Sequence, residues 1–143
     1  MPDEPTVGIV VVSHSAAVAE ATVELVRQLA NLGPGGPRVV AAGGMADGAI
    51  GTDAVRIATA IGRADAGAGA VILADLGGAV LATQLALDEL VPRDLAARAR
   101  LSGGPLVEGT FIAAVQASAG DGVDGVAAAA NEAAGMDKLG TRS

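Results

Sequence analysis

Short stretches that predict strands alternate along the chain with segments in which apolar residues recur every three or four positions. The first stretch, residues 7–12, is β-branched except for Gly8, which is typical of a strand buried on both faces of a parallel sheet. A second apolar strand is predicted at residues 70–74, and shorter strands are predicted at residues 38–42 and 98–102. This alternation predicts an α/β fold: a doubly wound, mainly parallel sheet of four to five strands with helices on both faces. The fifth would be an edge strand exchanged or paired across a dimer.

The segments between these stretches predict helices. After the first strand, apolar positions recur at alternating spacings of four and three, and we expect them to form a buried stripe; they are Val18, Thr22, Leu25, Leu29 and Leu32. A second helix, over residues 54–61, follows Thr52 as candidate N-cap and Asp53 as an acid in the first turn. A third runs through the leucines Leu81, Leu85, Leu87 and Leu90. Residues 106–117 and 123–134 are also predicted to be helical.

The length and composition of the chain favour a single domain. The chain has 143 residues, of which 51% are apolar, and this is ample for one core. Phe111 is the only aromatic residue, so the core has to be packed from Ala, Val, Leu and Ile. We expect one domain over residues 1–143, with its core in residues 6–135 and a flexible tail at 136–143.

Charge and residue usage exclude several classes of function. The formal net charge of −7 argues against binding nucleic acid, and the absence of cysteine excludes disulfides and thiolate metal sites. The first apolar run is too short to span a bilayer. The only lysine, Lys138, lies in the tail, and no P-loop motif is present. We therefore expect a cytoplasmic protein with no metal, no cofactor, no membrane partner and no nucleic-acid partner.

His14 is the only histidine, and it stands where the first strand ends and the first helix begins. The first turn of a helix presents backbone N–H groups without intrahelical partners, which favours anions there. An imidazole nitrogen beside such donors is suited to accept a phosphoryl group. A purely structural histidine is the alternative. We favour the phosphoryl acceptor because ligands bind at the carboxyl ends of strands in open α/β sheets.

Asp75 repeats this arrangement at the end of the third strand, directly before the small residues Gly77 and Gly78. In a parallel sheet the ends of the two strands can be neighbours, so Asp75 is a candidate to accept a hydrogen bond from His14 and fix its tautomer. Helix N-capping by Asp75 is an equally weighted alternative. The glycine-rich loop 43–48 is expected at the same edge of the sheet.

Four segments together resemble one known family. These segments are VGIVVVSHSAAVAEATVELVRQL, AAGGMADGAIGTDAVRIATAI, VILADLGGAVLATQLALDEL and PLVEGTFIAAVQASAG. They are similar to the DhaM family, the phosphotransfer subunits of phosphoenolpyruvate-dependent dihydroxyacetone kinase. The DhaM domain looks like the EIIA domain of the mannose family of the sugar phosphotransferase system. The resemblance covers residues 6–135 and implies an α/β fold that forms homodimers.

The resemblance also implies roles for individual residues. His14 would be the phosphorylated residue, and Asp75 would be the aspartate beside it. Phosphate-binding residues would be Ser15, Gly43, Gly44, Thr52, Gly77 and Gly78. Family members commonly carry serine where this chain has Gly78, so a hydroxyl contact to phosphate is lost there while the backbone N–H remains.

The resemblance implies a relay of partners. His14 would receive phosphate from the carrier HPr and pass it to ADP bound on the DhaL subunit, while the DhaK subunit holds dihydroxyacetone. Some members carry HPr-like and enzyme I-like domains, for which this chain has no room, so we expect a separate HPr as donor. Two alternatives stay open: a mannose-type EIIA domain that donates to a permease EIIB domain, and a non-catalytic regulatory binding module.

Overall fold

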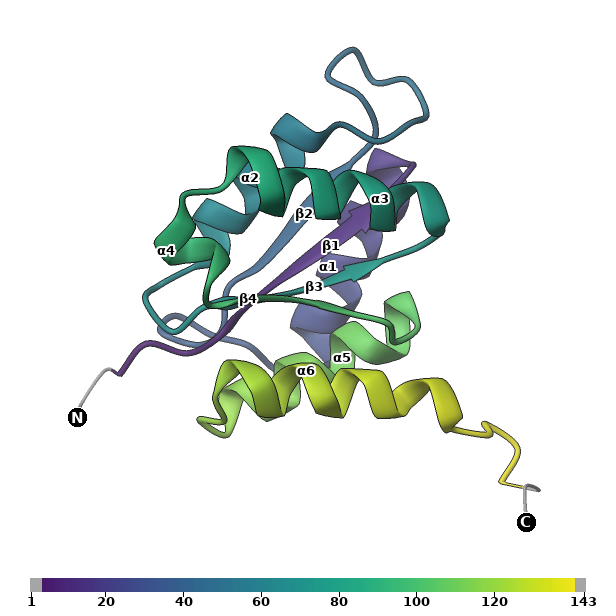
Figure 1. Cartoon of the computed structure of the whole chain (residues 1–143). Coiled ribbons are helices and arrows are strands. Elements are labelled where there is room, and N and C mark those ends of the chain that lie inside the picture. Colours follow the sequence, from purple (N-terminus) through teal and green to yellow (C-terminus); the bar gives the residue numbers. More distant parts are fainter. Residues whose placement is uncertain (1–3, 141–143) are drawn as a thin grey trace.

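A four-stranded parallel sheet forms the centre of the protein (Figure 1). The structure is a computed structural model and describes residues 4–140. The strand order is β2-β1-β3-β4, and every neighbouring pair is parallel. The strands are β1 (Gly8–Ser13), β2 (Val39–Gly43), β3 (Ala70–Ala74) and β4 (Ala99–Ser102).

Helices cover both faces of the sheet, as predicted. Successive side chains of a strand point to opposite faces, so Ile9 and Val11 enter one apolar cluster while Val10 and Val12 enter the other. Helices α1, α5 and α6 pack on the first face, and α2, α3 and α4 pack on the second (Figure 1). The helical elements are α1 (Ala16–Leu29), α2 (Ala54–Ala64), α3 (Gly77–Leu85), the π-helix η1 (Ala86–Leu90), α4 (Arg93–Ala96), α5 (Leu106–Ser118), α6 (Val123–Glu132) and the 3-10 turn η2 (Ala133–Gly135).

The buried stripe predicted for the first helix is wrong in most of its positions. Val18, Leu25 and Leu29 are 46%, 44% and 61% exposed. The helix instead packs on the sheet through smaller side chains, which are Ala19, Thr22, Val23 and Val26. Both sets have helical spacing, so periodicity alone does not distinguish them. The small set is the buried one, and small side chains let the helix lie close to the strands.

The third predicted helix is present as α3 and η1, and most of its leucines lie at the surface. Leu81, Leu85 and Leu90 are 68%, 52% and 46% exposed, and Leu87 is partly buried against the core. The core contacts of α3 and η1 come from Ala79, Thr83 and Ala86. These two elements therefore meet the core mainly through small residues, and several of their large apolar side chains remain at the surface.

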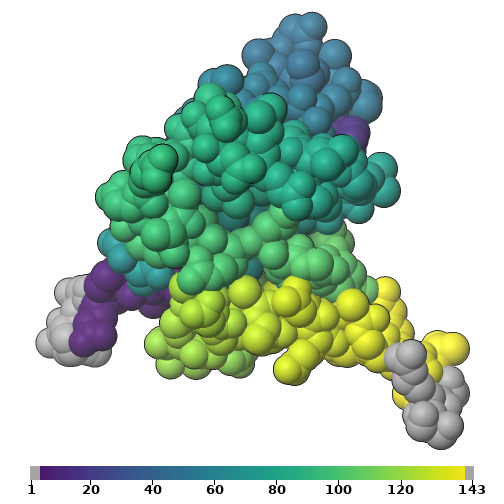
Figure 2. All heavy atoms as spheres, in the orientation of Figure 1, coloured from purple at the N-terminus to yellow at the C-terminus, as the bar shows by residue number. Residues whose placement is uncertain are grey.

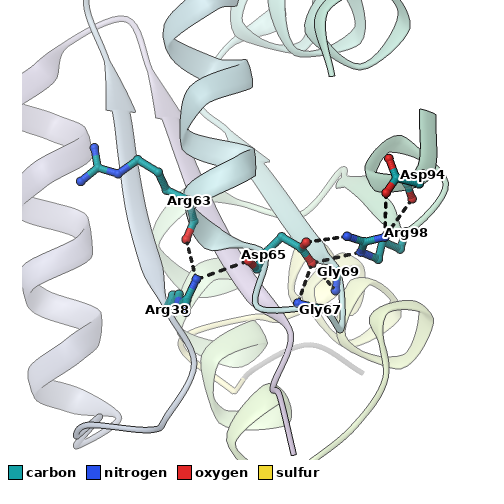
Figure 3. A network of polar contacts seen from close by, with 7 residues as sticks. All are labelled: Arg38, Arg63, Asp65, Gly67, Gly69, Asp94 and Arg98. Atoms are coloured by element: carbon teal, nitrogen blue, oxygen red, sulfur yellow. Dashed lines mark hydrogen bonds and ion pairs between the residues drawn. The ribbon is translucent and has the colours of Figure 1, made fainter. Parts of the chain in front are cut away.

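A network of ion pairs ties together the segments that enter the strands at their amino ends (Figure 3). Asp65 accepts hydrogen bonds from Arg98 Nε at 3.1 Å and Nη2 at 2.7 Å, and from the N–H groups of Gly67 and Gly69. Arg38 donates to the carbonyl oxygens of Arg63 and Asp65. The Arg98 hydrogen bonds, aided by those from the backbone, outweigh burial and lower the pKa of Asp65 to about 2. This network braces the edge of the sheet opposite His14.

Part of the predicted tail contacts α5, and none of the described helices is a candidate membrane span. Residues 136–140 of the predicted tail are described, and Lys138 forms an ion pair with Glu108 on α5; residues 141–143 lie outside the described residues. Flexibility of the tail stays a prediction. Within residues 4–140, no helix combines the length and the apolar character needed to cross a membrane.

The strand order reverses direction between β1 and β3, and this position is the topological switch point of the sheet. The connection from β1 to β2 runs through α1 on one face, and the connection from β2 to β3 runs through α2 on the other. Ligands bind at the carboxyl ends of the strands at such a point. In the space-filling view, the loop between β2 and α2 projects as a blue lobe beside a purple area at the start of α1 (Figure 2). The switch point therefore lies at the surface.

Candidate active site

The register of β1 and β3 brings His14 and Asp75 together. Val12 pairs with Ala74, so Asp75 is level with Ser13 at the end of β1, and His14 follows one residue further along. The Asp75 N–H donates to the Val12 carbonyl at 3.1 Å and continues this pairing. As a result, Nδ1 of His14 lies 3.0 Å from Oδ1 of Asp75. The hydrogen bond predicted between the two side chains is present.

The Asp75 carboxylate is held by four donors. Its Oδ1 accepts from the His14 ring and from the Leu76 N–H at 2.7 Å, and its Oδ2 accepts from the His14 N–H at 3.0 Å and from Ser13 Oγ at 2.9 Å. Burial acts to raise the pKa of Asp75, but the hydrogen bonds from His14, Ser13 and Leu76 outweigh it and lower the pKa below its ordinary value. Asp75 is therefore a fixed carboxylate at neutral pH.

The alternative in which Asp75 caps the third helix does not hold. The N-cap of α3 is Leu76, and this cap has no side-chain hydrogen bond. The Asp75 carboxylate accepts from the next residue along the chain and from β1, rather than from the second or third residue of the helix. The first turn of α3 is left without a side-chain cap, and this keeps it available for an anion.

Ser13 is a site residue that was not predicted. Its side chain is 1% exposed, its hydroxyl donates to Asp75 Oδ2, and the same oxygen accepts from the Ser15 N–H at 3.0 Å. Ser13 thus links the carboxylate to the start of α1. The sequence signal for it was a polar residue at the end of an otherwise apolar strand, directly before His14.

The tautomer of His14 follows from its partner. An ionised carboxylate only accepts hydrogen bonds, so we assign the ring proton to Nδ1 and the lone pair of the neutral ring to Nε2. The His14 side chain is 28% exposed. Nε2 faces the first turn of α3, since a Cβ built on Gly78 would lie 3.0 Å from this nitrogen. Gly77 and Gly78 come before Ala79, which is the first residue of α3 to donate its N–H within the helix, to the Leu76 carbonyl at 2.9 Å. A nucleophilic nitrogen therefore faces the helix turn that carries these two backbone N–H groups.

Ser15 lies at the start of α1, next to this pair. It is the N-cap of the helix, and its Oγ accepts from the Val18 N–H at 3.3 Å. Its hydroxyl proton is not used in that bond. Ser15 therefore caps the helix and retains a donor beside His14.

Gly43 and Gly44 pack against the start of α1. A Cβ on Gly43 would lie 2.6 Å from the Ser15 carbonyl oxygen, so this position has no room for a side chain. Gly44 has a φ of +67°, which favours glycine, and its N–H donates to the Ser13 carbonyl at 3.1 Å. These contacts explain both glycines through packing and turn geometry.

Thr52 lies in the loop before α2. The preceding residue, Gly51, donates its N–H to the His14 carbonyl at 2.9 Å, which ties this loop to the site. The N-cap of α2 is Asp53, whose carboxylate accepts from Val55 N–H at 2.9 Å. The prediction that Thr52 caps this helix is wrong, because the carboxylate one residue later reaches the free N–H groups.

No metal centre is found in the part of the chain that the structure describes. Within residues 4–140, no three or more His, Cys, Asp or Glu side chains are grouped so that they could hold a metal ion. The candidate site is therefore built from one imidazole, one carboxylate, two serine hydroxyls and backbone N–H groups.

Comparison with known proteins identifies the family of the chain. Residues 8–127 match the model of the EIIA-man family, described as the PTS system fructose IIA component. The chain therefore belongs to the EIIA-man family, and the resemblance predicted from its sequence is confirmed. A crystal structure of the unknown function protein EF1359 has a TM-score of 0.75 and 32% identity, and the match covers 89% of this chain and 94% of that chain.

Within this family the chain is similar to DhaM, the phosphoryl donor subunit of PEP-dependent dihydroxyacetone kinase. It is 42% identical to DhaM of Klebsiella michiganensis over 84% of this chain and 25% of the relative. It is 34% identical to a DhaM of Listeria innocua, subunit of kinase 2, over 77% of this chain and 85% of the relative. The chain thus spans about a quarter of the length of the first relative and most of the second.

Proposed function

We propose that the chain is a phosphohistidine carrier in which Nε2 of His14 accepts and passes on a phosphoryl group. One observation carries this proposal: Nδ1 of His14 is bonded at 3.0 Å to an aspartate held by four donors, which leaves Nε2 as the free nitrogen. The membership in the EIIA-man family supports it. No cofactor or metal is required by this chemistry.

The transfer follows from the tautomer. The Nε2 lone pair forms the new N–P bond while the bond from phosphorus to the donor breaks, and its electron pair leaves with the donor. Positive charge develops on the ring as the bond forms. Asp75 stabilises that charge through Nδ1–H, which keeps its proton throughout. The N–H groups of Gly77 and Gly78 and the hydroxyl of Ser15 are proposed to bind the phosphoryl oxygens.

The proposed role of Gly43, Gly44 and Thr52, which the resemblance implies as phosphate-binding residues, is to shape the wall of the phosphate site. Gly43 and Gly44 shape the turn against α1, and the Gly44 N–H is donated to the Ser13 carbonyl. Thr52 follows Gly51, whose N–H donates to the His14 carbonyl.

The proposed partners are those that the resemblance to DhaM implies; the names of the relatives give only the phosphoryl donor subunit of PEP-dependent dihydroxyacetone kinase. HPr would donate the phosphoryl group to His14. ADP bound on DhaL would accept it: a terminal phosphate oxygen of ADP attacks phosphorus, and the electron pair of the N–P bond returns to the ring. DhaK, which holds dihydroxyacetone, would complete the kinase in the cytoplasm.

The test is a reconstituted transfer. The chain is incubated with phosphoenolpyruvate, enzyme I and HPr, and the labelled protein is then mixed either with DhaL and ADP or with a mannose-type EIIB domain. Loss of label to ADP supports the dihydroxyacetone kinase role, and loss to the EIIB domain contradicts it. Absence of labelling, with retained binding of a partner, would instead support the non-catalytic regulatory module.

We also propose that the chain forms a homodimer, as the resemblance implies. Large apolar side chains are exposed on neighbouring elements, including Val55 on α2 and Leu81 and Leu85 on α3. A second copy would remove such surface from water. Sedimentation equilibrium tests this directly: a dimer mass is expected, and a monomer mass at micromolar concentration would contradict it.

A further inference from the structure

Gly78 lies directly against the free nitrogen of His14. A Cβ built on Gly78 would be 3.0 Å from Nε2 and 3.5 Å from Cε1 of the imidazole. Its neighbour Gly77 differs completely, because a Cβ there would meet no atom within 4 Å. Both glycines are exposed and stand in the first turn of the same helix. Of these two glycines, only Gly78 therefore borders the nucleophilic nitrogen of His14.

The imidazole has little freedom to move away from a side chain at position 78. Its Nδ1 is bonded to Asp75, and the His14 backbone is held on both sides, by its N–H to Asp75 and by its carbonyl to the Gly51 N–H. A shift of the ring would lengthen the bond to Asp75. That bond is the one that fixes the tautomer and leaves the lone pair on Nε2.

The start of α3 is equally restrained. The Leu76 N–H donates to Asp75 Oδ1 at 2.7 Å, so the helix and the imidazole are bound to the same carboxylate oxygen. Moving α3 outward to make room for a side chain would break this bond. The gap between Gly78 and His14 is thus set from both sides by Asp75.

We propose that the missing side chain at Gly78 is what keeps Nε2 of His14 open to an incoming electrophile, so that Gly78 controls access to the nucleophile. The inference rests on the proposed function for its biological meaning. The space that a Cβ would fill borders the nitrogen, where the oxygens of a tetrahedral phosphoryl group have to be placed. The backbone N–H of Gly78 borders the same space and can bind those oxygens.

The proposal gives a reason for the glycine at position 78, where family members commonly carry serine. Serine at this position, common in the family, would add a hydroxyl but also a Cβ at 3.0 Å from Nε2. In this chain the spacing between α3 and the imidazole matches a glycine. The glycine is therefore a part of the site in its own right, rather than a lost contact.

The matched pair G78A and G62A tests the proposal. Both variants replace a helical glycine by alanine, and a Cβ on Gly62, which is exposed on α2, would meet no atom within 4 Å, so both change backbone freedom in the same way. Only G78A places a methyl group against Nε2. Circular dichroism and urea unfolding establish that both variants are folded, and the wild-type protein is the reference.

Two small electrophiles report on Nε2 without any partner protein. With phosphoramidate, the Nε2 lone pair forms the N–P bond while the P–N bond of the reagent breaks and ammonia leaves. With diethyl pyrocarbonate, Nε2 attacks a carbonyl carbon and ethyl carbonate leaves, decomposing to carbon dioxide and ethanol. Since His14 is the only histidine, histidine modification has a single source.

We expect G78A to slow both reactions about tenfold or more, the equivalent of about 1.4 kcal/mol of crowding at the site, and G62A to react like the wild type. G78A is also expected to shift the ¹⁵N resonance of Nδ1, while G62A leaves it in place. Reaction of G78A at the rate of G62A with either reagent would overturn the proposal. A wild-type protein that reacts with diethyl pyrocarbonate but never carries phosphate would refute the proposed function and still leave the Gly78 comparison valid.

Discussion

Ser13 Oγ lies 2.9 Å from Oδ2 of Asp75, and this contact joins the end of β1 to the carboxylate that orients His14. The same Ser13 oxygen accepts the Ser15 N–H. One buried hydroxyl therefore holds both the carboxylate and the entry to α1, on either side of the imidazole. The site therefore includes this hydroxyl as well as the two ionisable side chains.

Replacement of Ser13 by alanine should weaken Asp75 as an acceptor. The S13A variant removes one of the four donors that lower the pKa of Asp75, so this pKa should rise toward its ordinary value. We expect phosphoryl transfer to slow about tenfold. Carboxyl ¹³C NMR of Asp75 against pH measures the pKa, and S13T, which retains the hydroxyl, should recover most of the rate. An unchanged Asp75 pKa in S13A would contradict this role.

Replacement of Asp75 by asparagine should slow transfer about a hundredfold or more. The amide retains the shape of the side chain but loses the charge that stabilises the ring as it becomes positive. The measurement is the rate of labelling by phosphorylated HPr in a rapid-quench experiment. D124N serves as the control, because Asp124 is 82% exposed and pairs with Arg100. Equal rates in D75N and wild type would remove the role assigned to Asp75.

Asp65 should make the stability of the fold depend on pH in acid. Its pKa is lowered from 3.8 to about 2, so its contribution is complete above pH 3.8 and is lost as the pH falls through about 2. The side chain is 11% exposed, and we expect the loss to be about 1 to 2 kcal/mol after solvent screening.

The D65N variant isolates this effect. We expect its free energy of unfolding at neutral pH to be lower by about 1 to 3 kcal/mol, because Arg98 loses its charged partner. Its stability should also vary less between pH 4 and pH 2 than that of the wild type. Urea unfolding at several pH values measures both quantities. Labelling of His14 should be unaffected, since Asp65 lies at the opposite edge of the sheet; a large loss of labelling in a folded D65N would contradict this separation.

The strands and the pairing of His14 with Asp75 could be predicted because their signals are local. A β-branched run that stops at a polar residue marks both the strand and its end. Parallel order then brings the ends of β1 and β3 together. The parallel order itself followed from the alternation of strands and helices along the chain.

The buried faces of the helices could not be predicted from periodicity. In α1 and α3 both the large apolar residues and the small ones have helical spacings, and the small ones pack against the sheet. Which of the two sets is buried depends on how closely the helix lies to the sheet. The contact between Gly78 and His14 and the bonds from Arg98 to Asp65 likewise depend on three-dimensional placement, and no spacing in the sequence marks them.

The most direct test of the phosphohistidine carrier is the position of the phosphoryl group after incubation with phosphoenolpyruvate, enzyme I and HPr. Heteronuclear ³¹P and ¹⁵N NMR of the labelled protein locates the phosphorus on one atom. We predict a single acid-labile phosphoryl group on Nε2 of His14, absent from H14A. Phosphate on Nδ1 or on another residue, or no incorporation into the folded wild-type protein, would contradict the account.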